Sequence, residues 1–115
     1  VLVTKYRKKL LYGKIAEDVK QKIRELSEIH RFQVITMETD TDHIHILLEY
    51  DTTDRVCDLV KVIKQQTNQY LWVRYTRFLS KQYWKKRIFW SDGYFACSIG
   101  EVSSATIEKY IASQG

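Results

Sequence analysis

The chain has 115 residues, a length that favours one domain with a buried core. Hydrophobic residues make up 44% and charged residues 29%, which excludes a disordered chain, and no apolar run approaches the ~20 residues of a membrane helix. The net charge of +5 favours an acidic partner such as nucleic acid, with ordinary surface charge as the alternative.

The first half of the chain predicts a strand, a helix and a hairpin. β-Branched and apolar residues indicate a strand over 1–6, followed by a basic connector. From 14 to about 30, apolar residues recur every three or four positions, the spacing of a helix with one buried face. Two further strands are predicted over 31–39 and 43–50, joined by a polar turn at 40–42.

The second half predicts a helix, a strand and a last helix. Asp54 can cap a helix that runs to about Phe78, and the basic, aromatic stretch 79–87 predicts a loop or a frayed helix end. A strand is expected over 94–100, ending at a glycine. Ser103 is the expected cap of the last helix, at about 103–114.

The order of these elements predicts an α+β fold. The first six give βαββαβ, the ferredoxin-like (RRM-like) pattern, in which two helices cover one face of a four-stranded antiparallel sheet. The last helix is an addition to that pattern. No repeat or linker interrupts residues 1–115, so one domain is expected. Cys57 and Cys97 have no metal-like spacing and are expected to be reduced core thiols of a cytoplasmic protein.

Two histidines stand one residue apart in the third predicted strand. Side chains alternate along a strand, so His43 and His45 share the face that the helices leave open, close enough together to hold one divalent ion. An H-x-H pair also occurs without any metal. Asp40 and Asp42 could orient a histidine or simply form the turn. The same alternation turns Ile44, Ile46, Leu48 and Tyr50 toward the helices, and Leu47 and Glu49 to the face of the histidines.

The last predicted helix carries a tyrosine and a glutamine one turn apart. Tyr110 and Gln114 therefore share a helical face, and Ile107 and Ile111 can pack the helix down. Such a pair can present a phenolic nucleophile beside a neutral oxygen ligand. The alternative is an amphipathic surface helix whose tyrosine is half-buried.

Two motifs together resemble a known family. "DHIHILLEY" is similar to the HUH motif, His-hydrophobic-His, and "FWSDGYFACSIGEVSSATIEKYIASQ" (89–114) resembles the C-terminal signature of the single-tyrosine HUH transposases. In that family a G-Y-F strand, a glycine turn and a V-S-x-x-x-I helix lead to Y-I-x-x-Q. The opening "VTKYR" also matches the family's first strand. The chain thus resembles the TnpA-type enzymes of bacterial and archaeal insertion sequences, including their REP-associated relatives.

The resemblance implies a site and an activity. Its metal ligands fall on His43, His45 and Gln114, its nucleophile on Tyr110, and its metal is Mg²⁺ or Mn²⁺. The implied reaction cleaves and rejoins single-stranded DNA at hairpin-flanked sites through a 5′-phosphotyrosine. The family also implies a homodimer whose active sites are shared between subunits, in the prokaryotic cytoplasm and associated with the nucleoid. The group that takes the proton of Tyr110 is not identified by the sequence.

Two basic clusters are candidate DNA contacts. Cations bind phosphates and aromatic rings can stack on unpaired bases, whereas the alternative is solvated lysines with Trp90 and Phe95 in the core. The cations are Lys5, Arg7, Lys8 and Lys9 in the first cluster and Lys81, Lys85, Lys86 and Arg87 in the second, interleaved with Tyr83, Trp84, Phe89 and Trp90.

Three other functions compete with transposition. A domesticated HUH nuclease acting on repeated palindromes would carry the same residues. A non-catalytic module that binds single-stranded nucleic acid explains the fold and the charge, but not Tyr110 with Gln114. A zinc hydrolase would need a third strong ligand and a general base, and the chain has no H-E-x-x-H helix.

Overall fold

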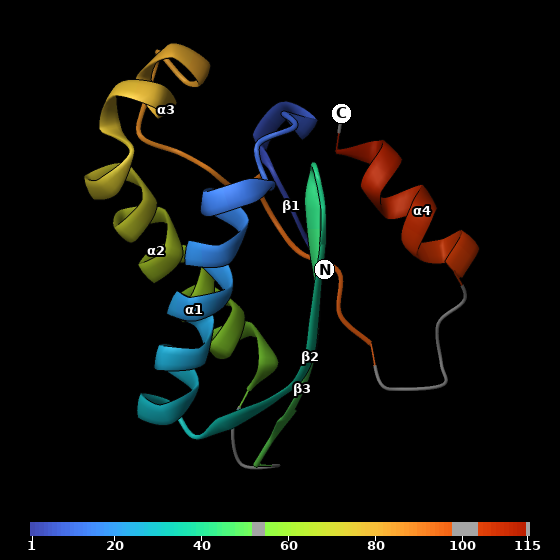
Figure 1. Ribbon diagram of the computed structural model, residues 1–115. Helices are drawn as coiled ribbons and strands as arrows, with labels where there is room; N and C mark the ends of the chain where they lie inside the picture. Colours follow the sequence, from blue (N-terminus) through green and yellow to red (C-terminus); the bar gives the residue numbers. More distant parts are fainter. Residues whose placement is uncertain (52–54, 98–103, 115) are drawn as a thin grey trace.

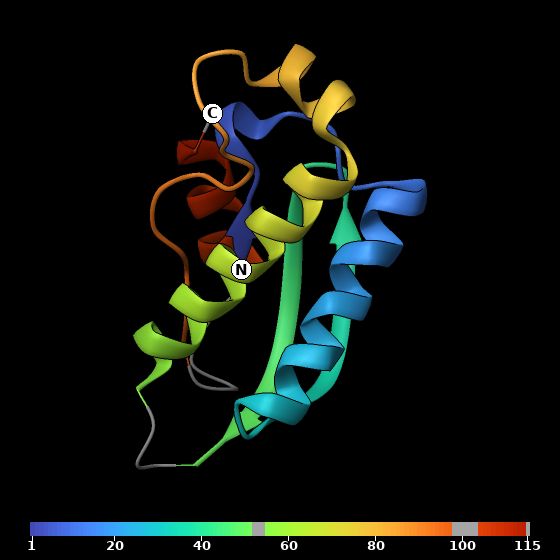
Figure 2. The same cartoon turned by 90° about the vertical axis from the view of Figure 1, so that its left-hand side faces the viewer.

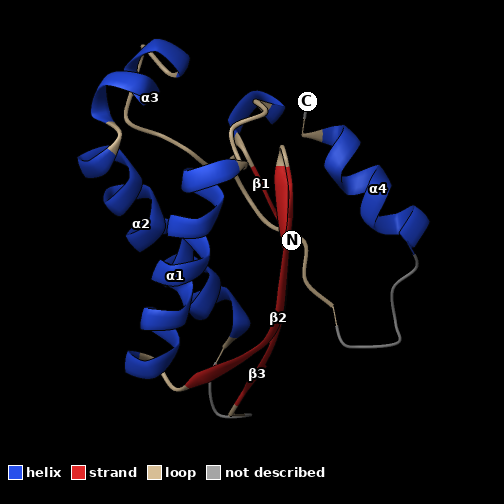
Figure 3. Cartoon of the chain, in the orientation of Figure 1, coloured by secondary structure: helices blue, strands red, loops and turns tan. Residues whose placement is uncertain are grey.

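The computed structural model describes residues 1–51, 55–97 and 104–114. Its elements are β1 (Leu2–Val3), the 3₁₀ helix η1 (Lys5–Arg7), α1 (Gly13–Ile29), β2 (Phe32–Asp40), β3 (His43–Tyr50), α2 (Val56–Arg74), α3 (Thr76–Gln82) and α4 (Ser104–Ser113) (Figure 3). The strands form one antiparallel sheet in the order β1-β3-β2. α1 and α2 cover one side of it and α4 lies on the other (Figures 1 and 2). The predicted α+β class is confirmed.

The core lies between the sheet and the two long helices. Ile15, Val19 and Ile23 of α1 are buried, as the helical spacing predicts, and Ile63 and Leu71 of α2 face them from the same layer. Burying each such side chain stabilises the fold by about 1.5–3 kcal/mol. None of the helices in the described parts of the chain combines the length and apolar character needed to cross a bilayer.

The β2–β3 hairpin confirms the predicted alternation of side chains. Ile44 is fully buried against the helices, and Ile46 and Leu48 pack partly buried beside it. His43 and His45 therefore point to the opposite face, the side on which α4 lies. The turn is two residues, Thr41 and Asp42, rather than the predicted three. That shorter turn fixes which residues of β2 stand opposite each histidine.

The predicted fourth strand is absent from the described residues. Residues 94–97 have no regular strand structure, and 98–100 lie outside the description. The segment 89–95 still follows the outer edge of β1, where the fourth strand of this fold would lie (Figure 2). Three separate backbone bonds hold it there: Lys5 N to Phe89 O at 2.9 Å, Ser91 N to Val3 O at 2.7 Å and Phe95 N to Val1 O at 3.1 Å. The ladder is interrupted at Gly93, whose φ of +78° turns the chain.

The first strand is shorter than predicted. β1 ends at Val3, and the chain turns into η1 because Tyr6 and Arg7 both have positive φ, 62° and 52°. Non-glycine residues rarely adopt this conformation, so the surrounding contacts must hold it. One of them is the ion pair of Arg7 with Asp42, described below.

The second helix also ends earlier than predicted, at Arg74 rather than Phe78. Tyr75 leaves the helical conformation, and the Thr76 hydroxyl donates to the carbonyl of Trp72, a local bond that competes with helix propagation. α3 then occupies the start of the stretch predicted as a loop or frayed end. The predicted caps Asp54 and Ser103 both lie outside the described residues.

Burial differs from prediction for the cysteines and for Tyr83 and Phe89, whereas Trp90 is in the core, as the alternative interpretation expected. Cys57 is half-buried and Cys97 is exposed, so the prediction of core thiols is wrong. Tyr83, Phe89 and Trp90 are buried instead, and they pack edge to face between the sheet edge and α2. Of the aromatic residues predicted to stack on DNA, Trp84 remains exposed.

A buried carboxylate joins α1 to the end of α2. Asp18 accepts a short hydrogen bond from the Tyr75 hydroxyl and lies 3.0 Å from Arg74 Nε and 3.6 Å from Lys14 Nζ. Burial would raise the pKa of Asp18, but the Tyr75 hydrogen bond and the two cations outweigh it and hold the pKa below its ordinary range. The ionised form of Asp18 therefore stabilises the fold.

Tyr75→Phe tests this link because it removes the hydroxyl and keeps the ring. We expect the free energy of unfolding to fall by about 1–2 kcal/mol near pH 7. Because the folded pKa of Asp18 is depressed, the loss should be full above its unfolded value of about 3.9 and should disappear as the pH falls through the lower pKa of the folded state. Urea unfolding at several pH values measures it. Tyr12→Phe, which removes an exposed hydroxyl at the start of α1, should change stability by less than about 0.5 kcal/mol, and an equal loss there would contradict the assignment.

Candidate active site

The two histidines form a compact pair on the face of the sheet opposite α1 and α2. Their ring centroids are 4.9 Å apart and the rings meet edge to face at 69°. Nδ1 of His43 lies 2.8 Å from Asp42 Oδ1, and the carboxylate accepts a hydrogen bond from the Nδ1–H group. This contact fixes the tautomer of His43 and leaves its Nε2 lone pair available to a ligand.

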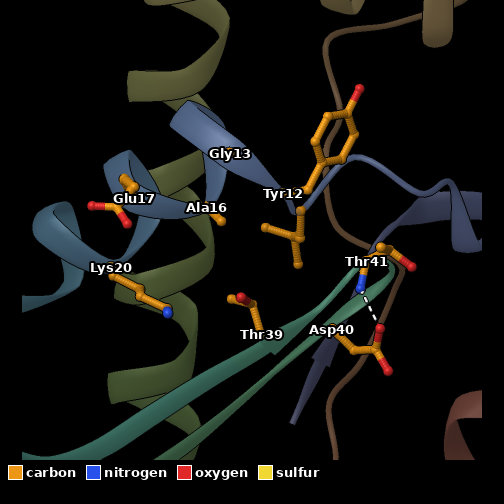
Figure 4. Close-up of a pocket in the computed structure, with 9 residues that line it drawn as sticks. Tyr12, Gly13, Ala16, Glu17, Lys20, Thr39, Asp40 and Thr41 are labelled. Carbon is orange, nitrogen blue, oxygen red and sulfur yellow. Dashed lines mark hydrogen bonds between the residues drawn. The ribbon is translucent and has the colours of Figure 1, made fainter.

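Asp42 and Asp40 take the two roles that the sequence left open. Asp42 is 8% exposed and bridges His43 to Arg7, whose Nε lies 3.2 Å from Oδ2. Burial would raise its pKa, but the contacts with His43 and Arg7 hold the pKa below its usual range. Asp40 instead forms the turn, since its Oδ1 accepts a hydrogen bond from Thr41 N at 2.7 Å (Figure 4). Only Asp42 orients a histidine.

His45 is set to be neutral. Burial lowers its pKa, and a proton on the neighbouring His43 ring would lower it further. The neutral imidazole is the form that binds a metal ion. Glu38 stands directly opposite His45 in the sheet, as Asp40 stands opposite His43. Sequence reasoning missed Glu38, and the signal that could have found it is a two-residue hairpin turn, which sets this register.

The pair fits a divalent ion as part of a larger ligand set. Both histidines can offer a neutral ring nitrogen, and they are close enough to share one ion. The described residues contain no group of three or more histidine, cysteine, aspartate or glutamate side chains able to hold a metal. Further ligands would have to be of another kind, such as an amide, water or a phosphate.

Tyr110 lies on α4 and packs against the segment 89–95 that runs beside β1. Its ring is 5.7 Å from that of Phe95, and its hydroxyl is 3.9 Å from the position a Cβ would take at Gly93. The hydroxyl is buried without a hydrogen-bond partner in the described structure. Burial raises the pKa of Tyr110. Within one chain the tyrosine is therefore held protonated and makes no hydrogen bond to either histidine.

Gln114 follows α4 in a turn. Its backbone N–H donates to Ile111 O at 3.1 Å, and its side-chain Nε2 donates to Ser113 Oγ at 3.1 Å. The prediction that Gln114 shares a helical face with Tyr110 assumed that the helix reaches Gln114, but α4 ends one residue earlier, at Ser113. The amide oxygen of Gln114 is thus at the end of the helix that carries the tyrosine.

The two basic clusters of the sequence meet on one surface. Tyr83 connects them, since its hydroxyl donates to Lys5 O at 3.1 Å and Lys8 Nζ lies 5.7 Å from its ring centroid. Trp84 and Tyr6 are 78% and 62% exposed there. Two predicted contacts are engaged within the chain: Lys5 lies 3.6 Å from Asp92, and Arg7 binds Asp42. Lys9, Lys81, Lys85, Lys86 and Arg87 are exposed.

A shallow hollow of about 400 Å³ lies between the start of α1 and the β2–β3 turn. Figure 4 shows Lys20 of α1 extending toward Thr39 of the hairpin, while the ring of Tyr12 points away from the hairpin. Of the residues predicted for the site, Asp40 lines this hollow. The carboxylate of Asp40 already accepts the hydrogen bond from Thr41 N that forms the turn. The hollow therefore adds nothing to the chemistry of the histidine pair.

The architecture and the two motifs agree with comparisons to known proteins. A model of the family "Transposase IS200 like" matches residues 1–114. The ISDra2 transposase TnpA of Deinococcus radiodurans is 33% identical over 110 residues, which is 96% of this chain and 77% of that protein. A crystal structure described as a transposase from the same organism has a TM-score of 0.88 at 24% identity, covers 98% of this chain and 85% of its own, and shows the shared fold. The chain belongs to the IS200-like transposase family.

Proposed function

We propose that this transposase cleaves and rejoins single-stranded DNA at hairpin-flanked sites, with Tyr110 as the nucleophile and His43, His45 and Gln114 as metal ligands. The observation that carries the proposal is the oriented histidine pair on the same side of the sheet as the helix that bears Tyr110. A domesticated nuclease acting on palindromes would use the same residues and the same chemistry.

The residues of the chain divide the work. His43 and His45 offer ring nitrogens to a Mg²⁺ or Mn²⁺ ion, with Asp42 holding the ring of His43, and Gln114 adds a neutral oxygen. When bound, such an ion supplies Lewis-acid activation and orientation of the scissile phosphate. The Tyr110 oxygen loses its proton and attacks phosphorus, so that a P–O bond to Tyr110 forms. The bond to the 3′ oxygen breaks, and that oxygen takes up a proton to leave as a 3′-OH.

The 5′-phosphotyrosine retains the energy of the phosphodiester. Attack by another 3′-OH on the same phosphorus restores the tyrosine and joins two strands without a nucleotide cofactor. The sequence has no G-x-x-x-x-G-K-[ST] loop, which fits this route. The reaction would take place in the prokaryotic cytoplasm, on DNA of the nucleoid.

A homodimer with shared sites would complete the ligand set. In one chain the Tyr110 hydroxyl lies against Gly93, with no hydrogen bond to the histidines. We propose that α4 of one subunit supplies Tyr110 and Gln114 to His43 and His45 of the other. This arrangement also gives a role to the helix that the βαββαβ pattern does not need.

The merged basic surface is the proposed binding site for the DNA hairpin. Its exposed cations suit phosphates, and exposed Trp84 and Tyr6 suit stacking on unpaired bases. Lys5 and Arg7 border it while engaged with Asp92 and Asp42. Lys85, Lys86 and Arg87 are the contacts best exposed for this purpose.

Replacing Lys85, Lys86 and Arg87 together by alanine should weaken DNA binding and its salt dependence. Each phosphate contact contributes about −0.7 to −0.9 to the slope of log K against log salt, so the slope should become shallower by about 2–3. Fluorescence anisotropy with hairpin DNA at several salt concentrations measures it. Replacing Arg24, Arg31 and Arg55, which removes the same charge elsewhere, should leave the slope within about one unit of wild type, and an equal change would contradict the assignment.

Asp42→Ala should weaken metal binding without unfolding the chain. Loss of the carboxylate that orients a histidine ligand lowers metal affinity by about 10–100-fold. Titration with Mn²⁺, followed by electron paramagnetic resonance, measures the affinity, and circular dichroism checks the fold. Asp40→Ala is the matched control, because Asp40 forms the turn and does not contact a histidine ring. Equal affinities for the two variants would show that Asp42 does not position the ligand.

A covalent-adduct assay tests the proposed reaction. The protein is incubated with Mg²⁺ and single-stranded DNA from the ends flanking its gene, then run on a denaturing gel. The expected result is a shifted band that forms only when the DNA is single-stranded and the metal is present, so that EDTA prevents it. Tight binding of the same DNA with no adduct under any of several divalent metals would favour the non-catalytic binding module.

A further inference from the structure

A groove of about 500 Å³ runs between α2 and the segment 88–94. One wall of the groove is α2, which covers the side of the sheet opposite α4 (Figures 1 and 2), whereas the histidine pair is on the side of α4. Its polar lining includes Asn68 and Lys64 from α2, and Ser91 from the segment. The basic surface proposed to bind the DNA hairpin and the proposed metal ligands both lie outside this groove.

Two buried polar atoms in the lining have no partner within the described structure. Ser91 is 5% exposed, and its hydroxyl makes no hydrogen bond. The amide oxygen of Asn68 is equally unpartnered, while its Nδ2 is fixed by a 3.3 Å bond to Arg87 O. Buried polar groups are nearly always hydrogen-bonded, so these two atoms are available to a ligand or to a water molecule.

Lys64 adds a donor in the same place. Its Nζ binds Ser91 O at 2.8 Å and Gly93 O at 2.9 Å, which uses two of its three N–H groups. The groove therefore offers one acceptor on Asn68, one hydroxyl on Ser91 and one remaining cationic donor. This set matches a flat ligand that carries both a donor and an acceptor on one edge.

The remaining lining suits the same kind of ligand. Val60, Ile88 and Tyr94 are partly buried and supply apolar surface for the faces of a ring. Lys61 and Lys64 against Asp92 leave an excess of positive charge, which attracts a phosphate. Gly93 connects the groove to the nucleophile, since it lines the groove and also lies next to the Tyr110 hydroxyl.

We propose that this groove holds one unpaired nucleobase of single-stranded DNA. The base edge would hydrogen-bond with Asn68 Oδ1, Ser91 Oγ and Lys64, and its faces would pack on the apolar lining. That this DNA is also the substrate of the transposase rests on the proposed function. The binding of a base by the groove does not, because it needs neither the metal nor Tyr110.

Nuclear magnetic resonance of the ¹⁵N-labelled full chain tests the groove directly. The probes are the four deoxynucleoside 5′-monophosphates, with deoxyribose 5-phosphate and inorganic phosphate as controls. We expect the Asn68 side-chain amide and the backbone amides of Ser91 and Gly93 to shift and saturate with at least one nucleotide. Equal shifts with deoxyribose 5-phosphate would overturn the proposal, as would no saturable shift with any nucleotide, which would mean that water alone fills the groove.

Two variants and a matched control make the test specific. Asn68→Ala and Ser91→Ala should each weaken nucleotide binding by about fivefold, the effect of losing one hydrogen bond. Ser91→Ala should keep or raise the melting temperature, because its hydroxyl has no partner in the unliganded chain. Gln69→Ala removes an exposed amide one residue away on α2 and should bind as wild type does. Wild-type affinity in both groove variants would overturn the assignment.

The groove and the proposed reaction can fail separately. Saturable nucleotide binding with no covalent adduct would keep the groove and reject Tyr110 as a nucleophile. An adduct that forms with no nucleotide response would keep the reaction and reject the groove.

Discussion

Tyr110→Phe is expected to abolish the covalent protein–DNA adduct, lowering its rate of formation by roughly a thousandfold or more, to background. The change removes one oxygen atom, the one proposed to attack phosphorus. Because that hydroxyl is buried without a partner, its loss should not destabilise the fold. DNA affinity and melting temperature should therefore match those of the wild type while the adduct disappears.

The pH dependence gives a second measure of the same atom. Burial raises the pKa of Tyr110, so the phenol is protonated throughout the neutral range. If the proton leaves before attack, the adduct rate should rise with pH and should still be rising above pH 9. A rate that is flat between pH 7 and 9 would show that the phenolate does not limit the reaction.

Tyr12→Phe is the control for loss of a tyrosine hydroxyl in general. Tyr12 is 59% exposed and lies at the start of α1, away from α4, the helix that carries Tyr110. The control should form the adduct at the wild-type rate, and peptide mapping of the wild-type adduct should locate the DNA on Tyr110. An adduct that persists in Tyr110→Phe, or that maps to another residue, would reject the assignment.

The parts of the fold with strong periodicity were predictable from the sequence. The apolar spacing of α1 and the alternation along β3 were sufficient to place His43 and His45 on the face opposite the helices, and the structure confirms that. The ends of elements were not predictable, because they depend on local backbone conformation. Positive φ values at Tyr6 and Arg7 end β1, and Gly93 turns the chain just before the predicted fourth strand, so that the pairing of the segment 89–95 with β1 is interrupted.

The surroundings of the site depend on contacts between distant residues. The bridge from Arg7 through Asp42 to His43 needs the exact turn of the hairpin and the bend after β1. The burial of Tyr83 and Phe89 needs the segment after α3 to return along the edge of β1. Motifs identified the residue types of the site, whereas register and long-range packing decided their neighbours.

The position of Tyr110 leads to the second large effect, a rescue of activity between two inactive chains. Within one chain its hydroxyl lies against Gly93 and Phe95, and the described residues contain no group of three histidine, cysteine or acidic side chains able to hold a metal. A site completed by a second subunit would supply both missing parts. One chain carries His43→Ala and His45→Ala, and its partner carries Tyr110→Phe, so each is expected to be inactive alone.

Mixing these two chains should restore cleavage. In a mixed dimer with shared sites, one site has both changes and the other has an intact histidine pair with an intact Tyr110. Random exchange of equal amounts makes half of the dimers mixed, and each mixed dimer has one intact site out of two. About a quarter of all sites are then intact, so about a quarter of the wild-type activity should return. The chains are unfolded together and refolded, and two affinity tags verify that mixed dimers form. Mixed dimers that form but stay inactive would show that Tyr110 acts on the histidines of its own chain, after α4 moves away from Gly93.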